Sequence, residues 1–501
     1  MRTSIYLILF VWLVVGCESF LEEKSQNEIH PKTVSDMEKL LEGEAYYTSN
    51  EGHLFSRVTD IFTDDIACNV VTKTYLEEKQ RDRYRFLWQE NMFDDNGWGY
   101  DIAIWQVPYS RIKGCNVILE YMDQMDGDEV KQEHLRGEAY FLRGFYYFYL
   151  TNFFGFPYNY GNPAENPAVP LKLVSGVTDE KFERNSVAEC YAQIEKDLLK
   201  GVELMRVNKE RQSSQSFRVN YLTGYGMLSR MYLYMEDWDK AILYADSVLE
   251  VKSSLLRFEE KKSSSIYTMA GNIETLWVMG EKKVNGSYGE RCPYAISEDL
   301  VRLYTRDKTD GEVDWRDGGN GCNIAYLAWG FKYAMGDEGD YLYYGYERYG
   351  VSKTGSGSGN TWYTGGIRIA ELYLNRAEAY IRKYMEDGNQ EYARQALSDL
   401  NTLRQSRFSA SGFQEKNLED FEGDQQALLD FCLRERRREL CGEGNHRWFD
   451  LKRIGMPEIK HVYMDDDNGR GQEYVLEQGD ARYVLPIPEE VRLQNPNLNK
   501  K

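Results

Sequence analysis

The chain has 501 residues, a formal net charge of -20 at pH 7 and 14% aromatic residues. A chain this acidic is a poor binder of nucleic acid and of anionic lipid. Its length predicts about three domain-sized units at roughly 150 residues each, as a prior and not a count. Seven cysteines remain besides Cys17, without a CxxC spacing, so at least one of the seven forms no disulfide within the chain.

The only strongly apolar run lies near the N-terminus and ends at a cysteine. The run "IYLILFVWLVV" from Ile5 to Val15 is too short to cross a bilayer, which needs about 20 apolar residues, and it predicts a signal peptide over residues 1–16. Gly16 directly before Cys17 resembles the lipobox of bacterial lipoproteins, in which the cysteine is diacylated and becomes the new N-terminus. We therefore expect Cys17 to carry a lipid anchor. The alternative is an ordinary secretory signal followed by an unmodified cysteine.

Helical periodicity begins clearly in the second hundred residues. Apolar residues recur at offsets of 4, 3, 4 and 3 and so share one helix face: Leu135, Ala139, Leu142, Tyr146 and Tyr149. The helix should end near "NFFGFP", where Gly155 and Pro157 are stop signals. A Pro-rich connector then leads to a second predicted helix, from about Val187 to Met205.

Two later segments predict helical hairpins. "YLTGYGMLSRMYLYMEDWDKAILYADSVLE" reads as two helices joined by a tight turn near Glu236 and Asp237. Small and aromatic residues follow the pattern of a tetratricopeptide (TPR) hairpin, in which small residues let the helices approach closely: Ser229, Tyr232, Trp238 and Ala241. "AELYLNRAEAYIRK" with "EYARQALSDLNTLRQSR" repeats the pattern with a longer loop. We expect a helical scaffold over about 30–250 and 365–460.

Residues 255–365 lose helical periodicity and are rich in Gly, Tyr and Trp. Short alternating pieces such as "ETLWVMGE" predict strands, and irregular segments of this kind often carry binding residues. The predicted fold class is therefore mainly α, a TPR-like helical hairpin scaffold with an irregular, loop-rich second half that contains short strands. We expect one domain over residues 17–501.

Several separated motifs follow one another over nearly the whole mature chain: "CESFLEEK", "EAYFLRGFYYFYLTNFFGFP", "ETLWVMGE", "AELYLNRAEAY", "RERRRELCGEGNHRWFDLKR" and "YVLPIPEEVRLQNPNL". Together and in this order they resemble the SusD/RagB family of outer-membrane nutrient-binding lipoproteins of Bacteroidetes. The Arg-rich helix leading into "RWFDL", with "LPIP" further on, is the most specific of them. The resemblance implies a TPR-built protein on the outer face of the outer membrane that captures oligosaccharides for a TonB-dependent transporter of the SusC type. Acidic residues after Cys17 are similar to the surface-export signal of such lipoproteins: Glu18, Glu22 and Glu23.

The Arg-rich motif itself is interpreted as scaffold. Leu429, Leu433 and Leu440 form an apolar stripe. The i,i+3 pairs Glu435 with Arg438 and Arg436 with Glu439 are expected on more solvated faces, where each pair contributes a few tenths of a kcal/mol. Arg447 and Asp450 are expected to tie the helix end to a neighbouring loop.

Sugar binding would require aromatic ring faces with a few polar partners for the hydroxyl groups. Most aromatics here are expected in the core, including Trp105, Trp238, Trp277 and Trp448. Trp98 differs, because "DDNGWGYD" places it between two glycines in a loop, with Asn96 close by. The irregular segment supplies candidates for an opposing wall: Tyr294, Trp315 and Trp329. Trp315 has a competing structural interpretation, since "DWR" resembles a structural Asp-x-Arg of the family.

Catalytic motifs are missing from the sequence. The five histidines show no HExxH pairing, and neither G-x-S-x-G nor a P-loop occurs, so we expect a non-catalytic binding protein without metal or cofactor. Two alternatives stay open. One is a surface peptide binder, as the RagB branch implies; the other is a lipoprotein glycoside hydrolase, which needs only two carboxylates about 5 to 10 Å apart among 81 acidic residues.

Overall fold

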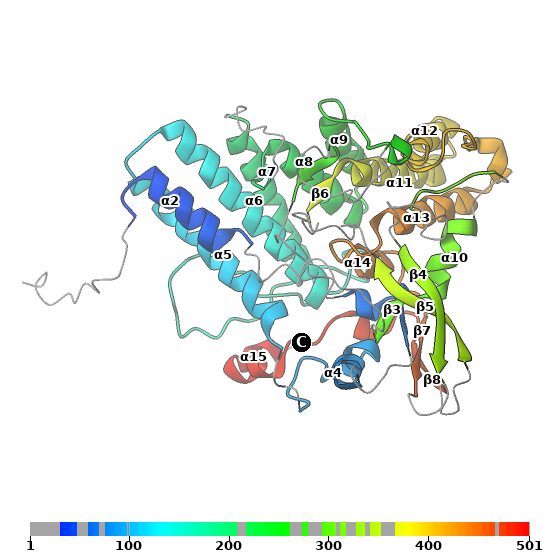
Figure 1. Cartoon of the computed structure of the whole chain (residues 1–501). Helices are drawn as coiled ribbons and strands as arrows, with labels where there is room; N and C mark the ends of the chain where they lie inside the picture. Colours follow the sequence, from blue (N-terminus) through cyan, green and yellow to red (C-terminus); the bar gives the residue numbers. More distant parts are fainter. Residues whose placement is uncertain are drawn as a thin grey trace, which may run out of the picture.

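The computed structural model of the chain is mainly helical (Figure 1). It describes residues 31–47, 59–69, 76–97, 99, 101–207, 217–260, 273–278, 293–306, 311–316, 327–335, 341–351, 366–465 and 470–499. The longer helices are α2 (Val34–Leu40), α4 (Leu76–Phe86), α5 (Ala103–Tyr121), α6 (Glu129–Phe154), α7 (Val187–Met205), α8 (Tyr221–Tyr234), α9 (Trp238–Leu249), α10 (Glu298–Arg306), α11 (Ile369–Asp387), α12 (Gln390–Arg407), α13 (Gln425–Leu440), α14 (His446–Arg453) and α15 (Glu489–Gln494). Within the described ranges, no helix combines the length and the apolar character that a membrane span requires.

The central pair α6 and α7 confirms the predicted boundaries. Helix α6 ends at Phe154 with Gly155 as its C-cap, and α7 begins after a capping box of Ser186 and Glu189. The aromatic residues of the C-terminal half of α6 are fully buried. A Cβ added at Gly201 of α7 would lie 2.8 Å from the carbonyl oxygen of Gly137 in α6, so glycine is what allows the two helices to pack this closely.

Both predicted TPR-like hairpins form, but the second has a shorter connection than the first and not the longer loop expected. Gly388 and Asn389 join α11 to α12, whereas Met235, Glu236 and Asp237 join α8 to α9. Helices α8 and α9 meet at a turn in which Glu236 takes a left-handed φ of 62°. The small residues Ser229 and Ala241 are fully buried, and the Ser229 hydroxyl donates to the Ala241 carbonyl at 3.0 Å. Helices α11 and α12 are joined at Gly388, with φ of 73°. These hairpins lie beside α7 and α13 across the upper part of Figure 1.

The described strands pair two by two, and each pair is antiparallel. The pairs are β1 (Ile66–Cys68) with β3 (Tyr294–Ile296), β2 (Thr275–Trp277) with β6 (Ile367–Arg368), β4 (Leu327–Met335) with β5 (Tyr341–Val351), and β7 (Ile459–Met464) with β8 (Gly471–Leu476). The predicted strand in "ETLWVMGE" is therefore confirmed as β2. The β4–β5 pair is longer than the short strands expected, because its aromatic residues favour extended backbone. Figure 1 shows β4, β5, β7 and β8 below the helices, on the same side as α4.

Helix α13 corrects the expectation of solvated charges. Glu435 and Arg438 do pair, at 2.7 Å, but both are buried. Arg436 pairs with Asp450 rather than with Glu439, at 2.8 Å. Residues of α12, α14, β6 and the turn at 311–316 supply charged partners of α13, so its polar faces are enclosed. Arg447 binds Asp64 of a neighbouring turn as expected, at 2.6 Å, whereas Asp450 binds helix residues instead of a loop.

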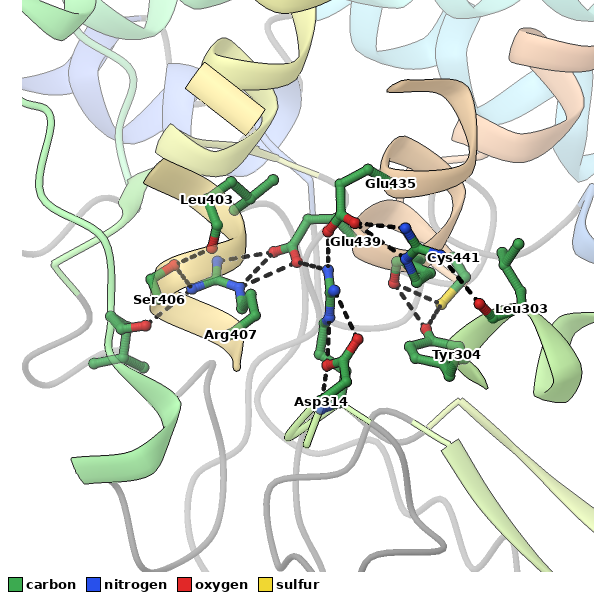
Figure 2. Close-up of polar contacts among 12 residues, drawn as sticks. Leu303, Tyr304, Asp314, Leu403, Ser406, Arg407, Glu435, Glu439 and Cys441 are labelled. Carbon is green, nitrogen blue, oxygen red and sulfur yellow. Dashed lines mark hydrogen bonds and ion pairs between the residues drawn. The ribbon is translucent and has the colours of Figure 1, made fainter. Parts of the chain in front are cut away.

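We call the buried ionic group around this helix the α13 charge network. Its members are Asp314, Arg316, Arg368, Arg407, Glu435, Arg438 and Glu439. Figure 2 shows Asp314, Arg407, Glu435 and Glu439 converging from separate segments. The network joins α12, α13, β6 and the turn at 311–316. It therefore links the helical scaffold to this turn of the irregular segment.

Candidate functional site

The structure describes four of the predicted site residues, and they lie in separate segments. Cys17 and Trp98 fall outside the described residues. Asn96 is half-buried in the loop before α5, Tyr294 lies in β3, and Trp315 lies in the turn at 311–316. Trp329 belongs to β4, opposite Arg348 of β5.

The loop at 94–97 and 99 is organised by its own side chains. One carboxylate oxygen of Asp95 accepts hydrogen bonds from the backbone N–H groups of Gly97 at 3.1 Å and Gly99 at 3.3 Å. Both glycines have left-handed backbone, with φ of 97° and 85°, a conformation that costs other residues free energy. Glycine at positions 97 and 99 is therefore explained by the left-handed backbone that each position adopts.

The same loop is anchored to three helices. The Asp94 carboxylate accepts from the backbone N–H of Glu489, at the start of α15, at 2.8 Å. Asp101 pairs with Arg85 of α4 and accepts from the N–H of Ala103 in α5 at 3.3 Å. Three aspartates thus hold residues at the two ends of the loop and the N–H groups of Gly97 and Gly99.

Tyr294 also contacts α4. Its hydroxyl donates to the Lys79 carbonyl at 2.6 Å, and its ring centroid lies 4.8 Å from that of Phe86. Burial raises the pKa of this phenol, so it stays protonated. Helix α4 therefore contacts Tyr294 directly and, through the Arg85–Asp101 pair, the end of the loop that carries Asn96. Strand β5, the partner of the strand carrying Trp329, lies beside β3 (Figure 1).

Trp315 belongs to different surroundings. Its backbone N–H donates to the Arg407 carbonyl at 3.0 Å, and its half-buried ring packs on the cluster that contains Phe258 and Tyr304. The flanking Asp314 and Arg316 form a 2.8 Å ion pair inside the α13 charge network. The structural interpretation of "DWR" is thus confirmed for the aspartate and the arginine. A ligand contact of Trp315 stays a prediction.

Two residues of α4 were not identified from the sequence: Arg83, which is exposed, and Lys79, which is buried. The guanidinium of Arg83 lies 5.0 Å from the ring centroid of Tyr463 in β7, and the Lys79 ammonium lies 5.1 Å from the same ring. The i,i+4 spacing of Lys79 and Arg83 was visible as one helix face. The approach of β7 could not be read, because it is separated from α4 by several hundred residues.

A groove of about 470 Å³ lies elsewhere, between α12 and residues 415–419. Amides, hydroxyls and charges of both signs line it, including Arg394, Ser398, Gln405 and Glu415, and its lining contains no aromatic ring. It therefore lacks the ring face on which a sugar would stack. Among the described residues, no group of three or more His, Cys, Asp or Glu side chains is placed to hold a metal ion.

Comparison with known proteins gives consistent matches along the chain. Residues 19–233 match a family model described as starch-binding, associating with the outer membrane, and residues 317–501 match the model of the SusD family. SusD-like protein P2 of Formosa agariphila is 23% identical over 99% of this chain and 98% of its own length.

Solved structures agree on the fold. A SusD-like carbohydrate binding protein from Bacteroides vulgatus has a TM-score of 0.66 at 21% identity, covering 94% of this chain and 98% of its own. A SusD superfamily protein from Bacteroides thetaiotaomicron has a TM-score of 0.68 at 22% identity, covering 93% and 99%.

Proposed function

Because the chain belongs to the SusD/RagB family, we propose that it is a non-catalytic, surface-exposed lipoprotein of the outer membrane that binds oligosaccharides and passes them to a SusC-type TonB-dependent transporter. The observation that carries this proposal is the pair of family matches, over residues 19–233 and 317–501, one of them described as starch-binding. The carbohydrate-binding name of the Bacteroides vulgatus neighbour supports the same ligand class.

The binding face that we propose is centred on the loop before α5. Trp98 supplies a ring face, Asn96 supplies hydrogen bonds to hydroxyls, and Tyr294 and Trp329 contribute from the strands beside α4. Trp315 is the weakest member of the set, because its neighbours belong to the α13 charge network. The support for this arrangement is the set of contacts through which Asp94, Asp95 and Asp101 hold the described residues of the loop.

Calorimetry and affinity gels against a panel of polysaccharides test the function. We expect the wild type to bind at least one neutral glycan, and Trp98→Ala to abolish that binding without lowering the melting temperature. Tyr121→Ala removes an exposed aromatic at the far end of α5 and is the matched control. Binding of peptides with no response to any glycan would replace the proposal with a RagB-type peptide binder, and release of reducing sugar by purified protein would make it a glycoside hydrolase.

The anchor and the partner are tested separately. Cys17→Ala should move the protein from the membrane fraction to the soluble fraction, and mass analysis of the wild type should show an acylated N-terminal cysteine. Protease added to intact cells should degrade the wild type. A SusC-type transporter should co-purify from detergent-solubilised membranes. Full protection from protease, or an unacylated N-terminus, would contradict the proposed location.

A further inference from the structure

The loop that follows α6 carries an aromatic ring with one covered face and one open face. The rings of Phe156 and Tyr160 are stacked, with centroids 4.4 Å apart and planes inclined by 14°. Phe156 is half-buried and packs against the main core, whereas Tyr160 is 40% exposed. Since Phe156 covers one face of Tyr160, the exposed area is chiefly the opposite face and the hydroxyl edge.

The backbone of this loop is held in place. The Tyr160 N–H donates to the Pro157 carbonyl at 3.0 Å, and the side chain of Asn166 donates to the Tyr160 carbonyl at 2.6 Å. The side-chain amide of Asn159 donates to a Glu236 carboxylate oxygen and to the Arg453 carbonyl, both at 2.8 Å. These bonds tie the loop to the α8–α9 turn and to the end of α14. Binding of a ligand here would cost the protein little conformational entropy, because the backbone that carries the Tyr160 ring is already held in place.

Two carboxylates accept hydrogen bonds from asparagines of the same loop. Asn162 donates to one oxygen of Glu165 at 2.9 Å, and Glu236 receives one bond from Asn159, so each carboxylate retains capacity to accept from hydroxyl groups. These carboxylates repel anionic ligands, which makes uronic and sulfated sugars poor candidates. A flat ring with nearby acceptors suits the C–H face and the hydroxyls of a neutral pyranose.

The loop lies at the same end of the α5–α6 pair as the proposed binding face. Residues 94–101 lead directly into α5, and Tyr160 follows directly after α6. The start of α5 packs on the end of α6, since the rings of Trp105 and Phe154 are 5.0 Å apart. Both loops therefore emerge from one end of the pair (Figure 1).

We propose that Tyr160 is an accessory subsite for a neutral pyranose ring of the same glycan chain that occupies the face around loop 94–101. The inference rests on the proposed glycan binding and adds a second contact along the chain. Two linked contacts raise the overall affinity only for ligands long enough to reach both. Chain-length dependence is thus the signature of the subsite.

Calorimetry with a size series of the oligosaccharide that the wild type binds tests the subsite. Tyr160→Ala should weaken binding of the long members roughly two- to tenfold, the range expected for loss of one aromatic contact, and leave the shortest member unaffected. Tyr160→Phe keeps the ring and should bind like the wild type. Tyr160→Leu keeps an apolar cover over Phe156 without a ring face and should show the same loss as alanine.

Tyr121→Ala is the matched control, because Tyr121 is 44% exposed but lies at the opposite end of α5. Tyr121→Ala should bind every member of the series like the wild type. Tyr121→Ala and Tyr160→Ala should both melt at the wild-type temperature. Equal affinities of the wild type and the Tyr160 alanine and leucine variants for long glycans would overturn the subsite alone. A wild type that binds no glycan would overturn the proposed function together with the subsite.

Discussion

The α13 charge network makes a quantitative prediction for Glu435→Gln. Glu435 is fully buried and accepts from Arg316 and Arg438, each at 2.7 Å. Glutamine keeps the shape of the side chain and removes its charge. Two buried arginines then lose a shared counter-charge, while Arg316 keeps its ion pairs with Asp314 and Glu439.

The magnitude follows from the pKa of the carboxyl group. Burial opposes its ionisation, but the guanidinium groups of Arg316, Arg438 and Arg404 outweigh burial and lower the pKa of Glu435 from 4.5 to about 2. A difference of one in pKa corresponds to about 1.4 kcal/mol, so the charge contributes roughly 3 kcal/mol to the free energy of unfolding at pH 7. Measured costs of breaking buried pairs, about 3–5 kcal/mol, are of the same size.

Equilibrium urea unfolding of the wild type and the variant at several pH values is the assay. Because the folded pKa lies below the unfolded one, the contribution is fully present above pH 4.5 and is lost as the pH falls toward 2. The difference in free energy of unfolding between wild type and Glu435→Gln should therefore shrink by more than roughly half between pH 7 and pH 3. Asp430→Asn changes an exposed acid on the same helix and should cost less than about 0.5 kcal/mol. A variant as stable as the wild type at pH 7, or a gap that does not change with pH, would refute the reasoning.

Three further predictions concern the loop, the helix pair and a buried lysine. Asp95→Ala should weaken glycan binding roughly two- to tenfold in calorimetry, because the N–H groups of the turn lose their acceptor, whereas Asp95→Asn should retain most of the affinity. Gly201→Ala should lower the free energy of unfolding by about 1–3 kcal/mol in urea titrations, since its Cβ would meet backbone at 2.8 Å, while Gly176→Ala, with open space around it, should be neutral. Burial lowers the pKa of Lys452 to about 7, below its unfolded value of 10.5, so the unfolded chain binds more protons between these values. Wild-type stability should therefore rise relative to Lys452→Met from pH 7 to pH 9, and a constant difference would contradict the assignment.

Local signals in the sequence were sufficient for helices α6 to α9. The boundaries of α6 and α7 depend on caps and stop residues only a few positions away, such as the box of Ser186 and Glu189. The close packing of α8 on α9 was readable from Ser229 and Ala241, because both helices belong to one hairpin. The turn at Gly97 and Gly99 could also be predicted in part, because the two glycines and the preceding Asp95 lie close together in the sequence.

Tertiary structure decided whatever depends on partners distant in the chain. The pairs of α13 were expected in solvent, but Glu435 meets Arg316 across 119 positions and is buried, which no periodicity in α13 records. Tyr294 was a candidate for the ligand face in the sequence, and the fold brings its hydroxyl to Lys79. Tyr160 was not singled out in the sequence, and its stacking on Phe156 is seen only in the fold. Sequence determines backbone states because these depend on near neighbours, whereas burial depends on which remote surfaces meet.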